Sequence, residues 1–159
     1  MNSLAWTLLS IAVAALFLGF VILWVRYRVA ARRRDEMIAA RKSFHQRREW
    51  IEARFITEAM QSGKPRGLRW VNCDFRDDVS FARDCETGQL TALVGVTISF
   101  EAIEGGGMEE VEAVSNLRAA TAVFHYEKGQ WTTKGRAIMN LEPLEAIEHF
   151  RGKLVRIAE

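Results

Sequence analysis

The sequence predicts an α+β protein with a single N-terminal transmembrane helix, and three observations support this class. The first is an uncharged apolar run, Ser3–Val25. The second is a stretch without Gly or Pro, rich in helix-forming residues, between Ala30 and Gln61. The third is a change to a two-residue apolar period after Pro65, which is typical of strands. We therefore expect a long basic juxtamembrane helix packing onto a curved, four- to five-stranded antiparallel sheet, followed by a short C-terminal helix.

The apolar run is long enough to cross a bilayer. As a helix it spans about 35 Å, and Trp6 and Trp24 lie about 27 Å apart near its ends, where indole rings favour the headgroup layers. A cleaved signal peptide has a basic segment first, a shorter apolar stretch and small residues at its end. This run instead ends in Leu23, Trp24 and Val25. A signal anchor therefore fits better than a signal peptide or a buried core helix.

Basic residues follow the span and none precedes it. The nearest are Arg26, Arg28, Arg32, Arg33 and Arg34. Because basic flanks stay on the cytoplasmic side, we expect Met1 outside and the domain in the cytoplasm. The arginines should contact anionic lipid headgroups, each contributing about 1 kcal/mol. Ala15 and Gly19 lie four residues apart, a spacing that allows close helix pairing, although an alanine-rich span also explains it.

The formal net charge of +2 conceals a division of the chain. Residues 26–55 contain ten basic and four acidic side chains, a net charge of +6, whereas residues 56–159 carry −4. The basic segment therefore belongs beside the membrane, and we expect no nucleic-acid partner. We divide the chain into an anchor (1–25), a basic stalk helix (26–43) and an α+β globular domain (44–159).

One apolar stripe on the long helix should cover the sheet. It consists of Met37, Phe44, Ile51, Phe55 and Ala59. The recurring spacing of four and seven residues is typical of one helix face. Gly63 and Pro65 should end this helix, because Gly allows a left-handed cap and Pro blocks continuation.

Alternating apolar residues predict the strands of the domain. We expect strands at 67–75, 79–84, 90–103, 110–126 and 131–139, with turns at 76–78, 86–88, 105–107 and 127–130. Gly95 and Gly135 fall inside strands and indicate bulges or bends. Asn140 should cap a final helix that begins near Glu142 and Pro143 and continues to Leu154.

The closing hairpin at 123–140 reads VFHYEKGQWTTKGRAIMN: an aromatic strand, a Gly turn, a Trp and a return strand. With the order of elements before it, this segment resembles the cystatin-like and NTF2-like α+β folds, in which a curved antiparallel sheet wraps a helix. The resemblance covers roughly the second half of the domain. It implies a scaffold that hosts enzymes, binding modules and assembly components, so it selects no function. Only one helix precedes the sheet, so the resemblance does not imply a deep pocket.

Few residues suggest chemistry. His125 falls within a strand, where it could line a pocket and act as a general base, or could simply lie partly exposed on the sheet. Asp74, Asp77 and Asp78 surround an expected turn but lack the EF-hand pattern, so we interpret them as turn residues. Cys73 and Cys85 form no metal or redox motif and should be free thiols in a reducing cytoplasm, or a disulfide if the domain lies outside.

An acidic group flanks the three consecutive glycines. Its members are Glu101, Glu104, Glu109, Glu110 and Glu112. Such a hairpin tip is normally solvated and protects a sheet edge, but it could also dock a basic partner.

Together these features favour a membrane-anchored interaction or assembly module that is not an enzyme and uses no cofactor or metal. Its expected partners are the lipid bilayer with its anionic headgroups and a protein, either a second copy or a different chain. The alternative is a membrane-tethered domain with a small-ligand-binding or enzymatic pocket around His125. A third reading is a lipid-surface sensor built on the arginines.

Overall fold

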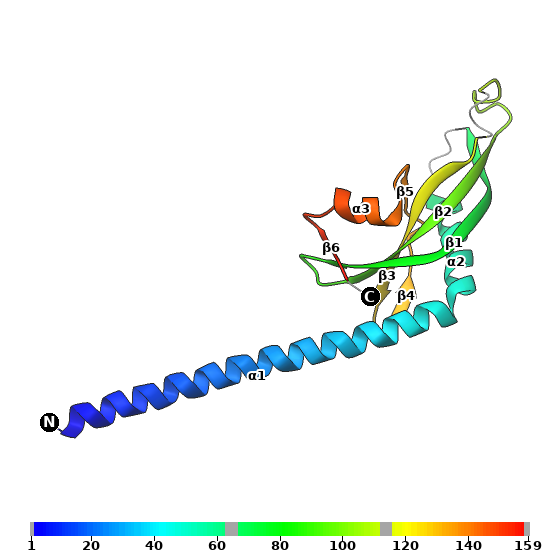
Figure 1. Cartoon of the computed structure of the whole chain (residues 1–159). Helices are drawn as coiled ribbons and strands as arrows, with labels where there is room; N and C mark the ends of the chain where they lie inside the picture. Colours follow the sequence, from blue (N-terminus) through cyan, green and yellow to red (C-terminus); the bar gives the residue numbers. More distant parts are fainter. Residues whose placement is uncertain (1, 63–66, 112–115, 158–159) are drawn as a thin grey trace. The chain divides into compact units, whose positions relative to one another are not determined.

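The computed structural model describes residues 2–62, 67–111 and 116–157, which form two compact units, 1–39 and 40–159 (Figure 1). The elements are α1 (Asn2–Gln46), α2 (Arg48–Ser62), β1 (Leu68–Asp84), β2 (Leu90–Ala102), β3 (Arg118–Glu127), β4 (Gln130–Thr132), β5 (Ala137–Met139), α3 (Pro143–His149) and β6 (Leu154–Arg156). The expected α+β class is confirmed, with a long apolar N-terminal helix, a second helix and an antiparallel sheet.

The helix expected between Ala30 and Gln61 is divided at Arg47, which separates α1 from α2. No Gly or Pro lies near this position, so the sequence carries no signal for the break. The apolar stripe nevertheless continues across it. Phe44, Ile51, Phe55 and Ala59 of this stripe are buried, whereas Met37 is half-buried, and Ala40 joins the same core. The helix end expected at Gly63 and Pro65 lies outside the described residues, and α2 is described as far as Ser62.

In the described part of the chain, the sheet has six strands: five follow the order β4-β3-β2-β1-β6, and β5 pairs with β3 beyond this path. All pairings are antiparallel. The two strands expected at 67–75 and 79–84 are one strand, β1, and residues 76–78 form a bulge rather than a turn. Phe75 pairs with Val96 and Val79 with Val94, so the inserted residues leave both β1 side chains on the same face.

The C-terminal strands are shorter than expected. β3 begins at Arg118 rather than near residue 110, and residues 112–115 lie outside the description. The return strand expected at 131–139 is interrupted by a connector, 133–136, between β4 and β5. Gly135 lies in this connector with a φ of +66°, and a Cβ there would collide with the backbone of Ala59 in α2. The glycine is therefore needed where the connector passes against the helix.

The last helix is also shorter than expected. Its N-cap is Glu142, which forms a capping box with Glu145, whereas Asn140 lies before the helix with a φ of +58°. α3 ends at His149, and Leu154, which we expected on this helix, begins the edge strand β6. Three residue pairs join β6 to the end of β1.

Both faces of the sheet are covered. On one face, the end of α1 together with α2 encloses the larger core. The Phe44 ring lies 5.0 Å from the Trp131 ring and 5.6 Å from the Phe124 ring, between centroids. The Trp131 indole N–H donates to the Ala40 carbonyl at 2.9 Å, which satisfies the buried donor. This face therefore fixes the last turns of α1 to the sheet.

On the opposite face, Ala82 and Leu93 of the sheet pack against Ala146 and Ile147 of α3. β2 supplies both cores because its even-numbered residues face α2 and its odd-numbered residues face α3. The α3 face is only partly covered, and the uncovered part contains the candidate site.

Candidate functional site

The N-terminal part of α1 exposes large apolar side chains. Trp6, Phe17 and Trp24 are 71%, 69% and 50% exposed. A stretch within Val13–Gln46 reaches a mean hydropathy of 1.8, and none of it is buried. This helix is therefore long enough and apolar enough to cross a membrane.

The other expected span residues lie on the same helix. Ala15 and Val25 are exposed and Gly19 is half-buried, while the Ser3 side chain is outside the described part of the chain. The five arginines that follow the run are also exposed. The Arg28 guanidinium lies 4.9 Å from the centroid of the Trp24 ring, so a cation and an indole share one face at the end of the apolar run.

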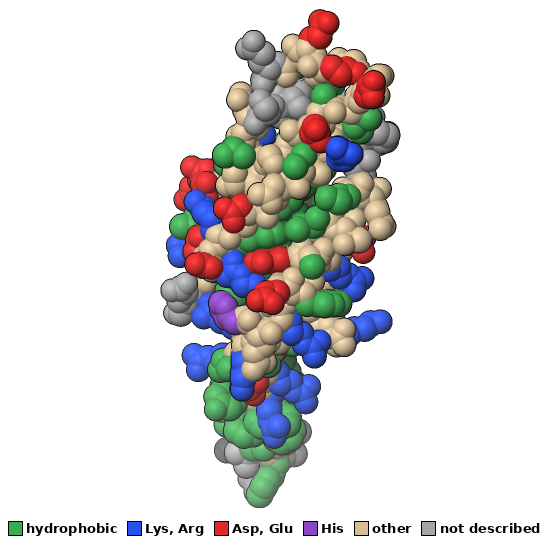
Figure 2. Space-filling model, turned by 90° about the vertical axis from the view of Figure 1, so that its right-hand side faces the viewer, with side chains coloured by type: hydrophobic (Ala, Val, Ile, Leu, Met, Phe, Trp, Pro, Cys, Tyr) green, Lys and Arg blue, Asp and Glu red, His purple; other side chains and the backbone are tan. Residues whose placement is uncertain are grey.

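The glutamates that flank the three consecutive glycines differ in their contacts. Figure 2 shows acidic side chains at the upper end of the domain, where Figure 1 places the connection between β2 and β3. Glu101 pairs with Arg69 at 2.6 Å. Hydrogen bonds from backbone amides, its own first, hold the pKa of Glu109 below its ordinary value. Glu104 and Glu110 are exposed.

Glu112 lies outside the described residues. Because Glu101 and Glu109 are already engaged within the domain, docking of a basic partner at this tip stays a prediction.

The three aspartates lie on β1 and do not surround a turn. Asp77 and Asp78 belong to the bulge, where Asp78 Oδ1 lies 3.7 Å from Arg76 Nε. No group of three or more metal-ligating side chains occurs among the residues that the structure describes. The expected turn at residues 76–78 is therefore wrong: these polar residues form a bulge, and β1 continues through them in the same direction.

Cys73 and Cys85 are free thiols. Cys73 is half-buried within β1, and burial raises its pKa, whereas Cys85 is exposed just after the strand. The two positions are separated by most of an extended strand, roughly 30 Å or more, and a disulfide requires Cα atoms within about 7 Å. The disulfide considered for an external domain is therefore excluded for these two residues within one chain.

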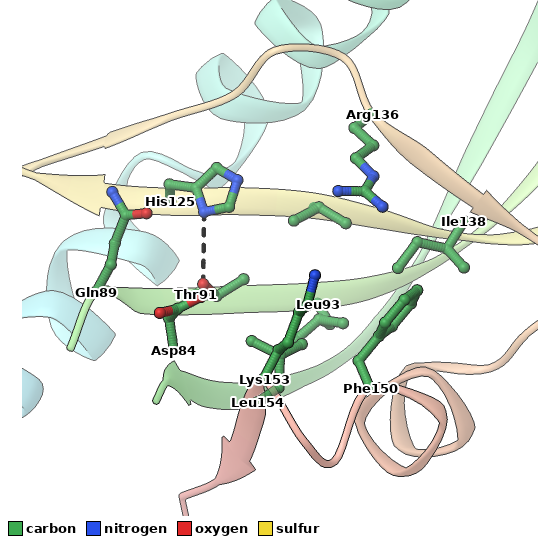
Figure 3. Close-up of a pocket in the computed structure, with 11 residues that line it drawn as sticks. Asp84, Gln89, Thr91, Leu93, His125, Arg136, Ile138, Phe150, Lys153 and Leu154 are labelled. Carbon is green, nitrogen blue, oxygen red and sulfur yellow. Dashed lines mark hydrogen bonds between the residues drawn. The ribbon is translucent and has the colours of Figure 1, made fainter. Parts of the chain in front are cut away.

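His125 lies on β3 and lines a hollow of about 160 Å³ on the sheet face that carries α3 (Figure 3). The floor and far wall of this hollow are apolar: Leu93, Val123, Ile138, Phe150 and Leu154. The remaining lining is polar: Asp84, Gln89, Thr91, His125, Arg136 and Lys153. We call it the α3-side hollow. It lies on the opposite side of the sheet from the α2 core.

Burial lowers the pKa of His125, and the nearby cations Lys134 and Arg136 lower it further, while Glu127 and Asp84 oppose this effect. The imidazole is therefore neutral at pH 7. Its Nδ1 lies 3.4 Å from the Thr91 hydroxyl oxygen, which is long for a hydrogen bond.

The Asp84 carboxylate is hydrogen-bonded within the turn between β1 and β2. Its Oδ1 accepts hydrogen bonds from the Thr87 amide at 2.7 Å, the Thr87 hydroxyl at 2.8 Å and the Glu86 amide at 3.0 Å. These bonds, those from Thr87 first, hold the pKa of Asp84 below its ordinary value, with a smaller contribution from Lys153. The carboxylate forms no ion pair with Arg136 or Lys153 in the described structure.

Sequence reasoning found His125 but missed Arg136, Lys153 and Phe150. These residues come from the connector before β5 and from the turn after α3, and only the strand pairing brings them together. One signal was present in the sequence. Leu93 and Val123 make the second face of β2 and β3 apolar as well, which indicates that something covers that face.

No protein-family model, curated protein or solved structure matches this chain. The resemblance to cystatin-like and NTF2-like folds therefore stays a prediction. The structure defines an α+β protein with a long apolar N-terminal helix, and such a fold alone selects no function.

Proposed function

We propose that this protein is a single-pass, membrane-anchored interaction or assembly module with a non-catalytic α+β domain in the cytoplasm. The observation that carries the proposal is the uncovered apolar part of α1, which is followed directly by five exposed arginines. A helix of this kind is stable in lipid, and the arginines favour the cytoplasmic side, where they meet anionic headgroups.

A non-catalytic role is supported by the polar groups around His125. General acid–base catalysis needs a partner within hydrogen-bond reach of the reacting proton, with a pKa near the working pH. Among the described residues, the hydrogen-bond contact of the His125 ring is with the Thr91 hydroxyl at 3.4 Å, and the Asp84 carboxylate accepts hydrogen bonds within its own turn. The hollow of about 160 Å³ is also smaller than the roughly 300 Å³ at which pockets for drug-sized ligands begin, so it has no room for a large substrate beside His125.

A sheet that curves around the helix is part of the same proposal. Bulges bend and twist the strand that contains them, and β1 has register shifts between Trp70 and Asn72 and between Phe75 and Val79. A curved sheet would present the part of its other face that α3 leaves uncovered to a partner, while α2 fills the concave face.

Cys85 provides a direct test of sidedness. In a Cys73→Ser variant, Cys85 is the single thiol, and it should react with a membrane-impermeant maleimide only after the cells are permeabilised. A Cys85→Ser variant is the matched control and should react slowly, because burial raises the pKa of Cys73. Labelling of Cys85 in intact cells would overturn the orientation, and recovery of the protein from the soluble fraction would overturn the anchor.

The assembly role needs a separate experiment. Lysine-directed cross-linking in native membranes, followed by purification in mild detergent, should yield a defined species larger than the 18.1 kDa chain. Mass spectrometry then distinguishes a second copy from a different protein. Isolated monomers without any co-purifying protein would count against the proposal.

A further inference from the structure

Two cations converge on the α3-side hollow without a carboxylate between them. Figure 3 shows the Arg136 guanidinium and the Lys153 amine pointing toward one another from opposite sides. Arg136 comes from the connector before β5 and Lys153 from the turn before β6. Within the described part of the chain, neither side chain forms an ion pair. Two like charges arranged in this way favour an anion between them.

One part of the hollow beside these cations is apolar. Leu93 and Val123 are buried below them, and Ile138, Phe150 and Leu154 are half-buried beside them. A cavity of about 150 Å³ lined by apolar side chains can hold a benzene molecule, and this hollow measures about 160 Å³. It can therefore accept one aromatic ring or a branched aliphatic group.

The geometry points to a binding site for a small carboxylate with an apolar body, whose charge lies between Arg136 and Lys153 and whose body lies against Leu93, Val123 and Phe150. Such a group occurs in a free aromatic or branched-chain acid and also at the C-terminal residue of a peptide. The site is independent of the membrane topology proposed above, so each proposal can fail without the other.

The charges near the site allow an anion to bind. The lowered pKa of His125 favours its neutral form, and the Asp84 carboxylate accepts hydrogen bonds within its own turn. The two positive charges of Arg136 and Lys153 and the one negative charge of Asp84 therefore leave a net charge of +1 among the lining residues. The arginine can bind a carboxylate through two parallel hydrogen bonds, and the lysine adds a mobile point charge.

The test uses isotope-labelled full-length protein in lipid nanodiscs and sodium benzoate as the probe. Benzoate should cause saturable shifts of the backbone amide signals of Leu93, Val123 and His125. Acetate, which lacks the ring, and benzyl alcohol, which lacks the charge, should bind at least about tenfold more weakly, because each loses one of the two contributions. N-acetylphenylalanine and its amide then distinguish the two sources of carboxylate. Stronger binding of the acid than of benzoate indicates a peptide C-terminus.

Two variants test the assignment of the cations. Arg136→Gln and Lys153→Gln should each weaken benzoate binding about tenfold. Arg151→Gln is the matched control, since this exposed residue on the same turn does not line the hollow, and it should leave the affinity unchanged. All three positions are exposed, so the fold should persist. Absence of saturable shifts, equal binding of acetate, or wild-type affinity in both cation variants would overturn the proposal.

Discussion

The Arg76 side chain crosses β2 at Gly95 and reaches the Glu142 carboxylate at the start of α3. A Cβ at position 95 would lie 2.5 Å from Arg76 Nε. Gly95 is therefore explained by the close approach of a neighbouring side chain, whereas the bulge itself lies in β1. This single contact connects the β1 bulge, the middle of β2 and the N-terminus of α3.

This contact predicts an energetic coupling between positions 95 and 76. In an Arg76→Ala background, Gly95→Ala should stabilise the protein by about 0.5–1 kcal/mol, because alanine restricts the unfolded chain. In the wild-type background the same change should lose this gain, since the guanidinium must move away from Glu142. Urea unfolding of the four proteins, followed by tryptophan fluorescence, measures the cycle. Equal effects in both backgrounds would show that Arg76 does not restrict position 95.

His125 predicts a pH dependence of stability. Its pKa is lowered in the folded protein from an ordinary value of 6.5, so the unfolded state binds more protons as the pH falls through that value. The free energy of unfolding should therefore decrease with falling pH, from about pH 6.5 down through the folded pKa. His125→Gln removes this proton linkage and should flatten the profile there. Thermal unfolding of both proteins between about pH 8 and about pH 5 tests it, and parallel profiles would contradict the prediction.

At the scale of elements, Arg48 connects α2 to the β1 bulge. Its guanidinium donates to the carbonyls of Arg76 and Asp77, the latter at 2.6 Å, and its Nε donates to Glu52 at 2.7 Å. These bonds satisfy carbonyls that an interrupted ladder leaves unpaired. They also explain how α2 is held at the point where the chain departs from α1.

Removal of the Arg48 guanidinium should destabilise the domain. Arg48 is 18% exposed in its side chain, so Arg48→Met should cost about 1–3 kcal/mol, because the hydrogen bonds from a charged donor to Glu52 and to the bulge carbonyls are lost together. Arg54→Met on the same helix is the matched control. Its side chain is 45% exposed and lies 3.8 Å from Glu58, so its loss should cost less than about 1 kcal/mol. Chemical denaturation compares the two, and equal losses would contradict the role given to Arg48.

Apolar periodicity alone was sufficient to predict some strands but not others. β2 was expected at 90–103 and is observed at Leu90–Ala102, because its alternation is uninterrupted and both neighbours pair along it. In place of β1 we expected two strands separated by a turn at the polar residues 76–78, because local composition cannot distinguish a bulge from a turn. We expected residues 133–136 to continue the strand. They leave the sheet where Gly135 passes against the backbone of Ala59, a contact between residues far apart in the sequence.

At the scale of the whole molecule, residues 40–159 form a compact unit with their own core. A fragment of residues 36–159 should therefore fold without the apolar run and remain soluble, since Ala40 keeps its hydrogen bond from Trp131. A cooperative thermal transition and dispersed amide signals would support this, and a non-cooperative, aggregating fragment would contradict it. Trp131→Phe in the fragment should lower stability by about 1 kcal/mol, because the Ala40 carbonyl loses its indole donor.

Sequence patterns were sufficient to predict the α+β class, the long apolar helix, the buried stripe around Phe44 and Phe55, and the uninterrupted strand β2. Each depends on hydrophobic periodicity, which is a local property of the chain. The division of the helix at Arg47, the continuity of β1 and the position of α3 became clear only from the three-dimensional arrangement. The meeting of Arg136, Lys153 and His125 around one hollow became clear in the same way. These features depend on contacts between residues far apart in the chain, where side-chain packing and hydrogen bonding outweigh local preference.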